Sequence, residues 1–261
     1  MNLQPVNSES ALQRRLKRFW CDNRKRKRGL LSFVESLHDV GAPAVFGGMV
    51  RDFARGGAVH FRSDVDMVVS TDDADHLDWF LRNYDSVRNK FGGHRVRLDR
   101  WLVDVWPVAN TWAFNQGYVD GGELKDLTQT TFFNWDAAVY EISTNHLHLI
   151  DRYIEDVEEG HLDINLEANP NPSGMVVRAW KLMRSMEASI SPELAVYICN
   201  FIYEHKNELI HSYASKASYY WITPETLDQF YGLLDEHLTA FPSCSFKLPP
   251  RQSSIFELLE N

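Results

Sequence analysis

The chain contains 261 residues and carries a formal net charge of −9, with 44% hydrophobic and 24% charged residues. This composition is typical of a globular protein and excludes a mostly disordered chain. No apolar run approaches the ~18 residues that cross a bilayer, so we expect no membrane-spanning segment. The first residues lack the charged-then-apolar pattern of a signal peptide, and the three scattered cysteines fit a reducing compartment, so we expect a cytoplasmic protein.

Basic residues are concentrated near the N-terminus. Residues 14–28 hold nine of the 27 Lys and Arg residues but a single acid, Asp22, which gives this segment a net charge of +8. Such a block can bind a phosphate backbone by releasing counterions, although a solvated helix face or a helix docked on the acidic body would carry the same residues. The candidate RNA-binding residues are Arg24, Lys25, Arg26, Lys27 and Arg28.

The first part of the chain mixes helical patterns with short apolar strands. In chain order the periodicity predicts two helices over 9–20 and 30–39, a strand over 44–46, a helix over 49–55, a strand over 64–69 and a helix over 72–88. Residues 94–98 and 101–107 alternate as in a hairpin, with Asp99 and Arg100 at its turn. A further strand is predicted over 143–150.

After residue 174 the pattern is helical, with helices predicted over 174–188, 192–206 and 223–240. We therefore expect an α+β chain in which a mixed sheet flanked by helices is followed by a smaller all-helical domain. The predicted divisions are a basic helical segment over 1–29, a head domain over 30–168 and a helical neck and C-terminal domain over 169–261.

Two carboxylates on one predicted strand are the sharpest chemical feature. Asp64 and Asp66 are two residues apart, so both side chains point to the same face of the strand. Because adjacent carboxylates are costly unless a cation lies between them, the pair favours a divalent metal, and Mg²⁺ prefers oxygen ligands together with phosphates. Asp104, in the middle of a later strand, is the candidate for a third carboxylate.

A glycine pair precedes these acids. Gly47 and Gly48 lie between a predicted strand and a predicted helix, where backbone N–H groups and the helix dipole bind phosphates. Each feature alone is common, since a glycine pair is usually a turn and an acid within a strand is usually a residue of its polar face. Their order and spacing together favour a site for a nucleoside triphosphate.

The order of these motifs resembles the tRNA nucleotidyltransferase and bacterial poly(A) polymerase family of the DNA polymerase β superfamily. The similar stretches are 47–52 (GGMVRD), 64–66 (DVD), 91–96 (FGGHRV) with Asp104, 133–140 (FNWDAAVY), 177–182 (VRAWKL) and 189–194 (SISPEL). The resemblance covers roughly residues 44–200. It implies a polymerase-β-like nucleotidyltransferase domain followed by the start of a helical neck.

The resemblance also implies roles for individual residues. Asp64, Asp66 and Asp104 would hold two Mg²⁺ ions, or Mn²⁺ in their place, and would be the catalytic residues. The implied nucleotide-binding residues are Gly47, Gly48, Arg51, Asp52, Asp136 and Arg178. The implied reaction transfers a nucleoside monophosphate from an NTP, with ATP or CTP favoured, to the 3′ hydroxyl of tRNA or a similar structured RNA.

The chain departs from the family pattern where the family selects the base. Residues 171–175 contain neither the acid nor the arginine that would pair with an incoming base, and residues 130–132 lack an Arg-Arg-Asp group. We therefore expect a divergent relative rather than a CCA-adding enzyme, and a toxin or defence factor is one role open to it. Two alternatives remain, a nucleotidyltransferase acting on a protein or small-molecule hydroxyl and a catalytically inert binding module.

Overall fold

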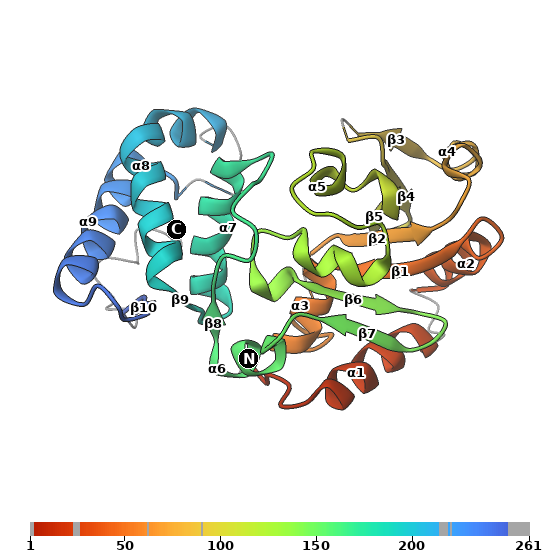
Figure 1. Ribbon diagram of the computed structural model, residues 1–261, viewed down its shortest axis with the longest axis horizontal. Coiled ribbons are helices and arrows are strands. Elements are labelled where there is room, and N and C mark those ends of the chain that lie inside the picture. The colour runs from red at the N-terminus through yellow and green to blue at the C-terminus, as the bar shows by residue number, and fades with distance from the viewer. Residues whose placement is uncertain are drawn as a thin grey trace. The chain divides into compact units, whose positions relative to one another are not determined.

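The computed structural model describes residues 3–22, 27–61, 63–89, 91–213, 219 and 221–249. The candidate RNA-binding residues Arg24, Lys25 and Arg26 lie outside these ranges. The chain forms two compact units, Met1–Glu159 with Asn165–Asn169, and Gly160–Ile164 with Pro170–Asn261 (Figure 1). The described part of residues 1–29, a range that the sequence set apart as a basic segment, clusters with the first unit.

Helices and strands alternate in the first unit. Its strands are β1 (Ala42–Phe46), β2 (Val65–Ser70), β3 (Ser86–Arg88), β4 (His94–Leu98), β5 (Trp101–Pro107), β6 (Ala138–Glu141) and β7 (His146–Leu149). Its helices are α1 (Glu9–Cys21), α2 (Arg28–Leu37), α3 (Gly48–Arg55), α4 (Ala74–Leu81), α5 (Trp112–Asn115) and α6 (Tyr153–Glu159), and its 3-10 turns include η2 (Val108–Asn110), η3 (Leu124–Gln129) and η4 (Asn134–Asp136). The helix expected over 72–88 is wrong in its second half, where the chain leaves α4 and forms β3 instead.

The strands of the first unit form one mixed sheet (Figure 1). Among the described residues its order is β3-β4-β5-β2-β1-β6-β7. Strands β2 and β5 run parallel, and the other neighbouring pairs run antiparallel. A mixed sheet with flanking helices is the α+β architecture that the sequence predicts, and the parallel pair at its centre carries the candidate catalytic acids.

Both faces of the central strands are covered. On one face of β2, Val65, Met67 and Val69 have no exposed surface. On the other face, Val68 packs in an apolar cluster with residues of β1, β6 and η3. Asp66 shares this second face with Val68, because side chains two residues apart on a strand point the same way. A partly buried carboxylate therefore stands next to an apolar cluster, as expected of a functional position rather than of a packing position.

An apolar stripe attaches helix α1 to the first unit. Leu12, Leu16 and Phe19 recur at helical spacing and are buried. The Phe19 ring meets the Phe53 ring of α3 edge-on, with centroids 5.2 Å apart. Arg15 donates a hydrogen bond of 3.0 Å to the carbonyl of Phe53 near the C-terminus of α3, where a cation is favoured by the helix dipole. One cation of the basic segment therefore has a structural role.

The second unit consists mainly of helices. They include α7 (Pro172–Ser185), α8 (Pro192–Tyr213) and α9 (Pro224–Ala240). Each begins at a proline, which fits the first turn of a helix because the backbone N–H groups of that turn have no acceptor within the helix. Within the described ranges, β8 (His161–Leu162), β9 (Ser189–Ile190) and β10 (Phe246–Lys247) also form a small sheet in the order β10-β9-β8. Two-residue strands carry no periodicity, so the all-helical expectation missed them. No helix in the described part of the chain has the length and apolar character to span a bilayer.

Candidate active site

Three carboxylates lie at one end of the parallel β2–β5 pair. Asp66 and Asp104 are direct partners in the register of these strands, so their side chains share one face. Asp64 stands directly before β2. Asp66 and Asp104 are partly buried, whereas the Asp64 side chain is 45% exposed. The structure thus brings together the three acids that the sequence assigned to catalysis.

Arg95 binds this group of carboxylates. The antiparallel register of β4 and β5 places it opposite Asp104. Its Nε and Nη2 donate to the two carboxylate oxygens of Asp104 at 2.8 and 2.5 Å, and Nη2 also donates to Asp64 at 3.4 Å. The hydrogen bonds to Asp104, joined by the charges of the neighbouring acids, raise the pKa of Arg95 despite its partial burial. Arg95, Asp104 and Asp66 therefore form one row across three strands, and sequence reasoning had not singled out Arg95.

The same oxygens are the candidate metal ligands. Within the ranges that the structure describes, no three His, Cys, Asp or Glu side chains are arranged to hold a metal ion. The donor set still fits Mg²⁺, because it consists of carboxylate oxygens and because Asp64 and Asp104 already converge on one cationic group, the Arg95 guanidinium. A divalent ion and Arg95 would compete for these oxygens.

The glycine turn lies between β1 and α3, close to the segment that leads into Asp64. Gly47 adopts a φ of +67°, in the region that favours glycine, and α3 begins at Gly48. A Cβ atom on Gly48 would lie 3.1 Å from the Cβ of Ser63, closer than an ordinary van der Waals contact, so Ser63 approaches the helix start closely here. The Ser63 Oγ is buried and makes no hydrogen bond to a described residue. An unpartnered hydroxyl beside a helix N-terminus suits a phosphate oxygen.

Arg51, Asp52 and Asp136 form a buried network of ion pairs behind this turn. Arg51 donates to Asp52 at 2.8 and 3.0 Å and to Asp136 at 2.5 Å, and all three residues are at most 7% exposed. Burial alone would lower the pKa of Arg51, but the charges of Asp136 and Asp52 raise it. Asp52 also accepts a hydrogen bond of 3.1 Å from the Ser63 backbone N–H, so the network fixes the segment before Asp64. A direct contact of these residues with a nucleotide stays a prediction.

The remaining candidate residues belong to the start of α2 and to α7 of the second unit. Lys27 is buried, donates to the Phe19 carbonyl, and pairs with Asp22 at 3.1 Å. It therefore does not fit the expected RNA-binding surface, because its charge is balanced inside the unit. Arg28 is exposed at the start of α2. Arg178 belongs to α7 of the second unit, so its place in a nucleotide cleft stays a prediction.

The site lies on the fold of the polymerase-β-like nucleotidyltransferases, with a helical part that follows it. A solved CCA-adding enzyme in complex with CTP is similar with a TM-score of 0.56 and 16% sequence identity, covering 93% of this chain and 57% of that one. The CCA-adding enzyme of Thermotoga maritima in complex with tRNA is similar with a TM-score of 0.53 and 16% identity, covering 95% of this chain and 58% of that one.

The resemblance predicted from the sequence is thus confirmed as a similarity of fold at low sequence identity. The chain spans less than three fifths of the length of both enzymes. No protein-family model and no curated protein sequence matches the chain.

Proposed function

We propose that the protein is a Mg²⁺-dependent nucleotidyltransferase that transfers a nucleoside monophosphate from an NTP to the 3′ hydroxyl of an RNA. The observation that carries the proposal is the register of Asp66 and Asp104 on parallel strands, with Asp64 directly before the first strand. The glycine turn nearby adds a place for the triphosphate. The solved enzymes of the same fold were captured with CTP and with tRNA, which supports CTP as a donor and tRNA or a similar structured RNA as the acceptor. ATP is the other donor that the family resemblance implies.

Different residues of the chain would carry out separate parts of the reaction. In the transfer, the 3′ oxygen forms a bond to the α-phosphorus while the bond to pyrophosphate breaks and the hydroxyl proton leaves. The Gly47–Gly48 turn and the Ser63 hydroxyl would bind the phosphates, and the Arg51–Asp52 pair would hold Ser63 in place. Asp64, Asp66 and Asp104 would hold the two Mg²⁺ ions, which supply charge neutralisation at the phosphates. Asp104 would also help to remove the proton from the acceptor hydroxyl.

The test is direct. Purified protein is incubated with Mg²⁺, total tRNA and each α-labelled NTP in turn, beside the Asp64→Asn/Asp66→Asn double variant. Label should enter RNA with the wild type and not with this variant. A control that loses the same charge at exposed positions, Asp72→Asn/Asp75→Asn, should keep the activity. Label on protein would refute the RNA acceptor, and the absence of turnover with every NTP would refute the nucleotidyltransferase.

A further inference from the structure

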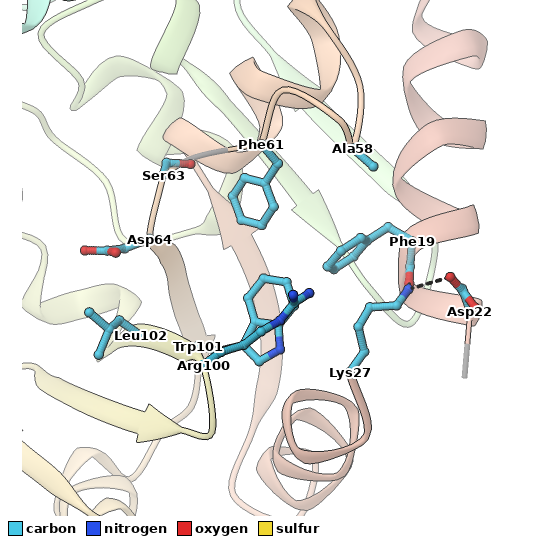
Figure 2. A pocket seen from close by; sticks show the side chains of 10 residues that line it. All are labelled: Phe19, Asp22, Lys27, Ala58, Phe61, Ser63, Asp64, Arg100, Trp101 and Leu102. Carbon is cyan, nitrogen blue, oxygen red and sulfur yellow. Dashed lines mark hydrogen bonds and ion pairs between the residues drawn. The ribbon is translucent and has the colours of Figure 1, made fainter. Parts of the chain in front are cut away.

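A pocket of about 600 Å³ lies beside Asp64 in the first unit (Figure 2). Its walls come from the end of α1, the residue before α2, the segment before β2, and the start of β5 with the turn before it. Asp64 lines one part of it and Lys27 another. These two were singled out in the sequence, whereas the aromatic residues of the pocket were not.

The pocket has aromatic walls. The rings of Phe61 and Trp101 are 22° from parallel, with centroids 6.0 Å apart, and the Phe19 ring meets each of them edge-on. Phe61 and Trp101 are only partly buried, and both rings line the pocket (Figure 2). Accessible aromatic faces are the platforms on which the bases of single-stranded nucleic acids stack, and this contact tolerates every base.

A cation stands at the same wall. The Arg100 guanidinium lies 4.7 Å above the Trp101 ring and is exposed, and it has no carboxylate partner among the described residues. An arginine stacked on an aromatic ring next to a base platform can pair with a phosphate of the same strand.

The cations continue along α1. Arg14, Lys17 and Arg18 are exposed, and in the described part of the chain none of them has an acidic partner. Arg14 and Arg18 are four residues apart and so lie on one face of the helix, whose C-terminal end borders the pocket through Phe19. A row of unpaired cations leading to a pocket matches several successive phosphates better than the single triphosphate of a free NTP.

From these observations we infer that the pocket binds the base of the nucleotide just upstream of the reacting 3′ hydroxyl, in a single-stranded RNA end. The inference rests on the proposed function, because the terminal hydroxyl must reach the carboxylates that include Asp64. The preceding nucleotide then lies next to Asp64, where the pocket begins. Its base stacks on Phe61 and on Trp101 in place of the Arg100 guanidinium, which turns to pair with the phosphate. The strand then continues over α1.

The experiment measures RNA binding without NTP, so it does not depend on turnover. The probe is an eight-nucleotide single-stranded RNA with 2-aminopurine as the penultimate base, followed by anisotropy for affinity and by base fluorescence for stacking. Trp101→Leu should weaken binding about tenfold, which corresponds to the loss of one stacked base, and should abolish the fluorescence quenching. Arg100→Gln should weaken binding about threefold and lower the salt dependence by about one phosphate contact.

Matched variants show whether such effects are specific. Trp79→Leu removes a tryptophan that is 63% exposed on α4, and Arg88→Gln removes an exposed arginine of β3, so both should bind RNA as the wild type does. Trp101→Phe keeps an aromatic face and should retain most of the affinity and of the quenching, which separates stacking from a defect in folding.

The outcomes separate this inference from the proposed function. RNA affinities of Trp101→Leu and Arg100→Gln within twofold of the controls would overturn the pocket, and so would a wild type that binds no RNA. Loss of NTP affinity in place of RNA affinity would assign the pocket to the incoming base and overturn it as well. If RNA binding depends on the pocket but no label is transferred to RNA, the inference stands and the proposed reaction fails.

Discussion

Replacing Arg95 should tighten the binding of divalent cations. Arg95 makes a bidentate contact with Asp104, at 2.8 and 2.5 Å, and a longer one with Asp64, at 3.4 Å. Two of the three candidate metal ligands are therefore paired with a guanidinium in the metal-free protein. Arg95→Gln removes this competing cation but leaves a side chain of similar length, so the gain in metal affinity should equal the free energy with which Arg95 holds the carboxylates.

The structure sets the size of the effect. The Arg95 and Asp64 side chains are 50% and 45% exposed, so solvent screens their contact and it contributes at most about 0.5 kcal/mol. Asp104 is only 16% exposed and is held through two hydrogen bonds, so this contact contributes about 1 kcal/mol. The sum of about 1.5 kcal/mol corresponds to a roughly tenfold lower Kd for Mg²⁺.

The assay is a titration of Mn²⁺ or Mg²⁺ by calorimetry, without nucleotide. Arg97→Gln is the matched control, because Arg97 lies on the same strand, is 68% exposed, and pairs with Asp85 at 3.9 Å rather than with the candidate ligands. Both variants make the same change in net charge, so a difference between them reports the contact itself. An Arg95→Gln protein that binds the ions no more tightly than Arg97→Gln would refute the reasoning, and weaker binding would show that Arg95 assembles the site.

Four further predictions concern other parts of the first unit. Asp136→Asn should destabilise the unit by about 2 kcal/mol in urea unfolding, because a buried arginine loses one of its two charged partners. Ser63→Ala should raise the Kd for an NTP about tenfold, since it removes a hydroxyl offered to phosphate; equal NTP affinity would contradict this. Burial opposes the ionisation of Glu141, but hydrogen bonds from His148 and a threonine lower its pKa, so this stabilisation is present above the ordinary pKa and is lost as the pH falls below it. His148→Gln should weaken that loss in unfolding experiments between pH 6 and pH 3. If the transfer damages host tRNA, induced expression of the wild type should arrest cell growth, whereas cells that express Asp64→Ala should continue to grow.

Local signals accounted for the hairpin that carries Asp104. Alternating residues over 94–98 and 101–107, with a turn at Asp99 and Arg100, predicted β4 and β5 with the bounds that the structure has. A two-residue turn also fixes the register, since Leu98 then faces Trp101 and every other pair follows. The predicted hairpin therefore already implied that Arg95 lies opposite Asp104, although this pair was not inferred from the sequence.

Contacts between distant segments could not be predicted in this way. The direct pairing of Asp66 with Asp104 depends on two parallel strands whose register no turn determines. The end of the helix expected over 72–88 depends on β3, an edge strand that forms only by pairing with β4. Nothing in the sequence indicated a role for Ser63, because that role follows from its closeness to Gly48 and from a hydroxyl that has no partner among the described residues.

The row of Arg95, Asp104 and Asp66 also explains how the acids can gather before any metal binds. Neighbouring carboxylates repel one another, and the partly buried Asp66 and Asp104 also lose hydration, so a nearby cation stabilises the group. Arg95 meets this need from the adjacent strand, through a register that the hairpin fixes locally. The same contact must then weaken when a divalent ion arrives. Stability of the metal-free fold and affinity for the metal are therefore opposed through one side chain, so a substitution of Arg95 that improves one should impair the other.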